Sequence, residues 1–132
     1  MREIVANVII PTNLDNPLEA HEIEAAWIIA KHYNEVVEFL RPIDGYRVKT
    51  ADLVMNGVIW EVKSPIGKSK NTVEYTMRRA GKQSKYLIFD GRRAPLTDGF
   101  IEKKIVFELG KRRTIKKVVY IRKNKEVIEL ID

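Results

Sequence analysis

The sequence predicts an α/β fold in which a central mixed β-sheet is flanked by helices. Two kinds of pattern alternate along the chain: short apolar runs, which are typical of strands, and apolar residues spaced three and four apart, which are typical of amphipathic helices. The central sheet is expected to contain about five strands. The 132 residues suffice for one domain, spanning residues 1–132, with a core of its own.

The first part of the chain predicts a strand, a helix and a second strand. Residues 3–10 predict one strand or extended lead-in that ends at Pro11. Residues 18–33 predict a helix, and residues 36–40 predict the next strand. The apolar stripe of the helix consists of Ile23, Ala26, Trp27 and Ala30.

Asn56-Gly57 predicts a hairpin turn, because it lies between two apolar runs and favours the positive φ angles of a two-residue turn. The paired strands would be residues 53–55 and 58–62. Side chains alternate between the faces of a strand, so Glu61 and Lys63 should share one face. Asp52 should then lie near Glu61 across the hairpin.

The second part predicts two helices and three strands. Asn71, followed three residues later by Glu74, predicts a capping box at the start of a helix. Residues 98–109 predict a further helix that ends at Gly110. Strands are expected at residues 86–89, 115–121 and 126–131.

Basic residues are concentrated after residue 62. Residues 1–62 contain 5 Lys/Arg and 10 Asp/Glu, whereas residues 63–132 contain 19 and 8. This asymmetry indicates contact with a polyanion such as nucleic acid.

Several other classes of protein do not fit the composition. No apolar run approaches the roughly 20 residues that span a bilayer, and the N-terminus lacks the pattern of a signal peptide, so no membrane is expected. The absence of cysteine excludes disulfides and thiolate zinc sites.

The residues of the hairpin suit phosphodiester cleavage. Two carboxylates and an ammonium group are costly to gather unless something binds between them. A divalent metal and a phosphate would meet that cost, and Mg²⁺ or Mn²⁺ prefers oxygen ligands. Asp52, Glu61 and Lys63 therefore predict a metal-dependent nuclease.

The same residues resemble the PD-(D/E)xK nuclease superfamily: Asp52, then eight residues, then Glu61-Val-Lys63. The surrounding sequence is more specific. Trp60-Glu-Val-Lys-Ser-Pro-x-Gly, then Asn71-Thr72, Arg79-Ala80-x-x-Gln83-Ser84 and Asp90-x-Arg92-Arg93, resembles the tRNA-cleaving toxin domain at the C-terminus of contact-dependent growth inhibition proteins. This resemblance implies a restriction-endonuclease-like core.

It also implies roles for individual residues. Asp52 and Glu61 would hold the metal, and Lys63 would assist the attacking water. A glutamate of the first helix would join the site; Glu22 fits the family pattern, with Glu19 and Glu24 as alternatives. Residues expected to contact the substrate are Ser64, Asn71, Arg79 and Gln83.

The expected function is thus a metal-dependent endoribonuclease toxin that cleaves tRNA in the cytoplasm of target cells. A cognate immunity protein, expected to be acidic, would cover its basic cleft. Two alternatives stay open: a DNA endonuclease of the same superfamily, and a nucleic-acid-binding module without catalysis. Alanine in place of the usual proline before Asp52 departs from the family pattern, but this proline shapes backbone rather than chemistry.

Overall fold

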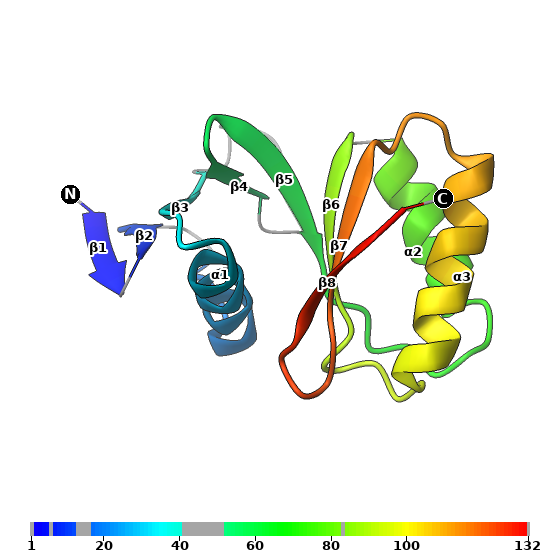
Figure 1. Ribbon diagram of the computed structural model, residues 1–132. Helices are drawn as coiled ribbons and strands as arrows, with labels where there is room; N and C mark the ends of the chain where they lie inside the picture. Colours follow the sequence, from blue (N-terminus) through cyan, green and yellow to red (C-terminus); the bar gives the residue numbers. More distant parts are fainter. Residues whose placement is uncertain (1, 6, 13–16, 41–51, 83, 132) are drawn as a thin grey trace. The chain divides into compact units, whose positions relative to one another are not determined.

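A computed structural model describes residues 2–5, 7–12, 17–40, 52–82 and 84–131. These residues form three helices and eight strands (Figure 1). The chain divides into two compact units, Met1–Trp60 and Glu61–Asp132, called here the N-terminal and C-terminal units. The mixture of strands and helices confirms the predicted α/β class, while the single domain of residues 1–132 stays a prediction.

The N-terminal unit contains four complete strands and one helix. Its elements are β1 (Arg2–Val5), β2 (Val8–Pro11), α1 (Ala20–Tyr33), β3 (Val37–Phe39) and β4 (Asp52–Met55), followed by the first residues of β5 (Val58–Lys63). β1 pairs antiparallel with β2, β2 parallel with β3, and β3 antiparallel with β4. The single strand predicted for residues 3–10 is therefore wrong, because the apolar residues on both sides of Asn7 suit one long strand and two short ones equally well.

Helix α1 confirms the helix predicted for residues 18–33, but its buried stripe is different. Its buried residues are Ala25, Ala26, Ile28, Ile29 and Ala30. Ile23 and Trp27 are only partly buried, and the Lys31 ammonium lies 5.0 Å from the centroid of the Trp27 ring. α1 packs against β2 and β3. It ends at Asn34, which adopts the left-handed conformation that favours asparagine and glycine.

The turn between β4 and β5 confirms the predicted hairpin. Asn56 has a φ of 52° and Gly57 a φ of 73°. Positive φ at both central residues defines a type I′ turn, whose twist matches that of the strands it joins. The turn sets the alternation of β5, which carries the candidate catalytic residues.

The C-terminal unit contains the rest of the fold. Its elements are the end of β5, α2 (Thr72–Gly81), β6 (Tyr86–Asp90), α3 (Asp98–Lys111), β7 (Lys117–Ile121) and β8 (Val127–Leu130). β5, β6 and β7 are parallel neighbours, and β8 pairs antiparallel with β7. Helices α2 and α3 lie side by side on one face of these strands (Figure 1).

A single apolar core joins these two helices to the sheet. Val73, Met77 and Ala80 of α2 and Ile101, Ile105 and Leu109 of α3 pack with Leu87, Phe89, Val118 and Tyr120 of the strands. This arrangement leaves the opposite side of each helix facing solvent. Among the described residues, no helix combines the length and apolarity required to cross a membrane.

Both helix termini predicted for this unit differ in detail. Asn71 precedes α2, but its side chain makes no capping hydrogen bond, so the capping box predicted with Glu74 is wrong. The backbone of Asn71 is already helical there, whereas a capping side chain needs an extended residue. α3 continues through Gly110 to Lys111, because the Arg112 N–H still donates to the carbonyls of Glu108 and Leu109.

Candidate active site

The predicted pair Glu61 and Lys63 lies on β5 with its charged groups in direct contact. The Lys63 Nζ is 2.9 Å from Glu61 Oε1, and the residues are 8% and 3% exposed. Glu61 pairs in register with Leu87 of β6, and Lys63 pairs with Phe89. Both side chains therefore point to the same face of the sheet as these two core residues. The prediction that both side chains share one face is confirmed, and the ion pair is buried.

A second polar cluster lies where β5 and β6 end. Asp90, the last residue of β6, is fully buried and accepts hydrogen bonds from Arg92 Nε at 2.9 Å and Arg92 Nη2 at 2.8 Å. The backbone N–H of Arg92 also donates to Asp90, at 3.1 Å. Ser64, directly after β5, donates to Asp90 Oδ2 at 3.4 Å and accepts from Arg93 Nε at 3.0 Å.

This cluster is built at the carboxyl ends of parallel strands, where α/β sheets commonly bind ligands. Of the predicted substrate contacts, Ser64 belongs to it, only one residue beyond Lys63. Asp90, Arg92 and Arg93 were part of the resemblance but were given no role from the sequence. Their position immediately after a buried apolar strand could have identified them.

Lys123 holds the segment that follows Asp90 in place. Its Nζ donates to the backbone carbonyls of Gly91 and Ala94, both at 2.8 Å. Gly91 itself packs against the phenol of Tyr120, where a Cβ would overlap the ring. The position of the two arginines is therefore set by contacts from the β7–β8 region.

Tyr120 is a buried hydrogen-bond donor in this region. Its hydroxyl donates to Asp98 Oδ1 at 2.6 Å. Burial raises the pKa of Tyr120 well above its usual range, and the hydrogen bond and negative charge of Asp98 raise it further. Tyr120 therefore stays neutral and ties β7 to the first turn of α3.

The other predicted substrate contacts lie along α2. Asn71 is exposed just before the helix, and its N–H donates to Ser69 Oγ at 3.1 Å. Arg79 is exposed in the last turn, and its Nη1 donates to the hydroxyl of Tyr75 at 3.1 Å. Eight residues of helix separate the two backbones by about 12 Å, so they do not form one contact point. Gln83 lies outside the described residues.

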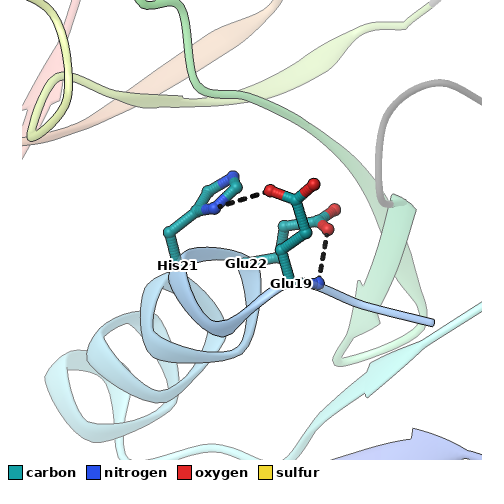
Figure 2. A group of neighbouring side chains, drawn as sticks. All are labelled: Glu19, His21 and Glu22. Carbon is teal, nitrogen blue, oxygen red and sulfur yellow. Dashed lines mark hydrogen bonds and ion pairs between the residues drawn. The ribbon is translucent and has the colours of Figure 1, made fainter.

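In the N-terminal unit, the first turn of α1 brings Glu19, His21 and Glu22 together (Figure 2). One ligand atom of each lies within 4.8 Å of the others. His21 Nδ1 is 3.2 Å from Glu19 Oε2, and Glu22 Oε1 accepts from the Glu19 N–H at 2.9 Å. The alternative glutamate, Glu24, is not part of this group of described side chains.

These three side chains could offer oxygen and nitrogen ligands to a divalent ion. The cluster also has a structural explanation, because Glu22 caps the helix and carboxylates are stabilised at the positive end of the helix dipole. The sequence does not predict His21 as a ligand, because a histidine two residues from a glutamate is a common spacing with no specific link to metal binding.

Asp52 is the first residue of β4 and is partly buried. Its carbonyl accepts a hydrogen bond from the Leu40 N–H at 2.9 Å. Asp52 and Glu22 belong to the N-terminal unit, and Glu61 and Lys63 to the C-terminal unit. The predicted approach of Asp52 and Glu22 to Glu61 stays a prediction.

Comparison with known proteins assigns the family. Residues 49–127 match the family described as the contact-dependent growth inhibition CdiA C-terminal domain. The chain belongs to this family. The matched range contains Asp52, Glu61 and Lys63, together with the cluster around Asp90, and leaves out the first turn of α1.

The fold of this CdiA C-terminal domain also has a solved counterpart. It is similar to a chain of the CdiA-CT/CdiI toxin and immunity complex from Burkholderia pseudomallei, with a TM-score of 0.68 and 15% sequence identity. The similarity covers 93% of this chain and 97% of the other. No curated protein matches the sequence. The chain is thus a contact-dependent growth inhibition toxin domain, as its sequence resemblance implied.

Proposed function

We propose that this CdiA C-terminal domain is a metal-dependent endoribonuclease that cleaves tRNA. The observation that carries the proposal is the buried pair of Glu61 and Lys63 on β5, whose charged atoms are 2.9 Å apart. A buried carboxylate and ammonium cost free energy to desolvate, so a pair kept in this position favours a functional rather than a stabilising role.

The carboxylates proposed as ligands suit Mg²⁺ or Mn²⁺. Asp52 and Glu61 would offer carboxylate oxygens, which these hard cations prefer. Glu22 would add a third carboxylate from α1. When bound, the metal would lower the pKa of a water molecule and stabilise negative charge on the scissile phosphate. PD-(D/E)xK superfamily membership is part of this proposal.

Lys63 would act on the reacting groups directly. Its side chain is held by Glu61, which orients the ammonium group and limits its rotamers. An oriented ammonium can stabilise the charge that develops on the phosphate or hold the attacking water. Ser64 and Arg93, which are hydrogen-bonded to each other, could contact the adjacent phosphate.

The proposal is tested by incubating the purified domain with total tRNA, total RNA and plasmid DNA, with Mg²⁺ or Mn²⁺ and with chelator. Cleavage of tRNA that chelator abolishes is the expected result. Lys63→Ala should abolish cleavage while leaving RNA binding nearly intact. Because it also removes the counter-charge of buried Glu61, circular dichroism must show that the variant is folded. Lys68→Ala is the matched control, since Lys68 is an exposed lysine of the following loop. Cleavage by Lys63→Ala at the wild-type rate would show that Lys63 does not belong to the active site.

The same digest separates the alternative functions. Cleavage of plasmid but not of RNA would indicate a DNA endonuclease. A gel shift without any cleavage would indicate a binding module.

We also propose that a cognate acidic immunity protein binds this domain and that the toxin acts in the cytoplasm of target cells. The support is the family, together with the net charge of +6. Expression of the wild type alone should be toxic to the producing cell, whereas Lys63→Ala should be tolerated. Normal growth with the wild type would contradict an intracellular toxin.

A further inference from the structure

Two exposed aromatic side chains on α2 and α3 are each accompanied by two cations. Tyr75 of α2 is 51% exposed, and the guanidinium carbons of Arg78 and Arg79 lie 5.6 and 5.7 Å from its ring centroid. Phe107 of α3 is 58% exposed, and the ammonium groups of Lys104 and Lys111 lie 5.8 and 4.4 Å from its ring. The two neighbouring helices thus repeat the same combination of an exposed ring and two cations.

Both rings lie on the solvent side of their helices. Tyr75 is two residues from Val73 and from Met77, which are buried, so it projects from the opposite side of α2. Phe107 is likewise two residues from Ile105 and from Leu109. We call the exposed residues Tyr75, Arg78, Arg79, Lys103, Phe107 and Lys111 the α2–α3 outer face.

The charge of this face has one sign. In the described part of the chain, all exposed charged residues of α2 and α3 are lysine or arginine. The acidic residues of these helices are partly or fully buried, and two of them are paired: Glu102 with Arg122, and Glu108 with Arg112. Glu108 also lies 3.6 Å from the ammonium group of Lys111, while the exposed charges of the face are all positive and attract polyanions.

Local cation–π contacts explain why the cations lie near the rings. They do not explain why two large rings are left half-exposed on one basic surface. Aromatic rings interleaved with lysine and arginine are the combination with which proteins bind single-stranded nucleic acids. The rings stack on bases, and the cations bind phosphates.

We propose that the α2–α3 outer face binds unpaired bases of RNA, with Tyr75 and Phe107 as stacking platforms. The inference rests on the proposed function, since it assigns this face to the substrate. Glu61 and Lys63 point to the inner side, toward the core that α2 and α3 cover. The outer face therefore contacts nucleotides away from the cleaved bond, and the preferred substrate is a folded RNA with an accessible loop.

Binding is measured in the Lys63→Ala background, so that RNA is not cut. The probes are a labelled single-stranded RNA of about 12 nucleotides and the same sequence as a blunt duplex. Tyr75→Ala or Phe107→Ala should weaken single-strand binding about 5- to 100-fold, with little effect on the duplex. Tyr75→Phe and Phe107→Tyr keep the rings and should stay within about threefold of the parent.

Matched controls separate stacking from charge. Ile131→Ala removes a 73% exposed apolar side chain of the same unit and should have no effect. Arg78→Ala should weaken both probes and reduce the slope of log K against log salt by about 0.7 for the single strand. Circular dichroism checks that each variant is folded. The fold should be preserved, because the replaced residues are exposed.

The inference is overturned if both ring-to-alanine variants bind single-stranded RNA within about twofold of the parent. Equal losses for the single strand and the duplex would also overturn it. Cleavage by the domain with an intact Lys63 is assayed in parallel. If RNA is bound through the rings but never cleaved, the proposed nuclease is refuted and the proposed binding face stands. If cleavage depends on Lys63 but binding does not depend on the rings, the binding face is refuted and the nuclease stands.

Discussion

Replacement of Arg92 by alanine is expected to destabilise the C-terminal unit by about 3–5 kcal/mol, because it leaves a buried carboxylate without its counter-charge. Asp90 is fully buried and accepts two side-chain hydrogen bonds from Arg92, at 2.9 and 2.8 Å. Charge-assisted bonds are worth about 1.5–3 kcal/mol each, so two of them give a loss in the same range. After the replacement, Asp90 keeps the backbone N–H of residue 92 and the hydroxyl of Ser64.

The assay must report on the C-terminal unit. Both tryptophans, Trp27 and Trp60, belong to the N-terminal unit, so their fluorescence is unsuitable. Hydrogen exchange of the amides of β6 and β7 in native conditions measures the free energy of opening directly.

Two further variants make the test specific. Arg93→Ala removes an exposed arginine that hydrogen-bonds to Ser64 and should cost about 1 kcal/mol or less. The double variant Asp90→Leu with Arg92→Leu removes both charges and should recover much of the loss. The reasoning is refuted if Arg92→Ala costs no more than Arg93→Ala.

Three other predictions follow from single contacts. Gly91→Ala should cost about 1–3 kcal/mol or more in urea unfolding, since a Cβ there would lie 2.5 Å from the Cζ of the buried Tyr120; unchanged stability would contradict this close approach. Stability should fall as pH rises above about 10, because the raised pKa of Tyr120 in the folded protein lets the unfolded chain lose its proton first. Tyr120→Phe should flatten that decline in urea titrations at successive pH values, and an unaltered slope would exclude Tyr120 as its source. Glu22→Ala should lower stability by about 0.5–2 kcal/mol through loss of the cap on the Glu19 N–H, whereas Glu22→Gln keeps the acceptor; if the glutamine variant is stable and still cleaves RNA fully, Glu22 is not part of the metal centre.

Local patterns predicted much of the fold. Asn56-Gly57 located the hairpin, because few other residue pairs accept positive φ at both positions. The apolar spacing of residues 18–33 located α1, and the run at 86–89 located β6. The predictions failed where a local pattern fits two structures. The apolar residues 3–10 suit one strand or two, and Asn71 suits a cap or an ordinary residue before a helix.

Part of the site was also accessible from the sequence. The alternation of side chains along β5 placed Glu61 and Lys63 on one face, and the structure confirms this arrangement. The family was predicted from the block of residues between Trp60 and Arg93, and the family match confirms it. Residue roles such as the metal ligation by Asp52 stay predictions.

By itself, the sequence determined the α/β class, the hairpin with its paired Glu61 and Lys63, and the toxin family, because these depend on periodicity, turn chemistry and local motifs. Only the tertiary structure decided which distant residues meet. Ser64 contacts Asp90 across 26 positions, and Lys123 reaches Gly91 across 32. Such contacts arise from the packing of parallel strands and their connections, and no local pattern encodes them. The structure likewise shows that the two rings of the α2–α3 outer face are exposed, at 51% for Tyr75 and 58% for Phe107.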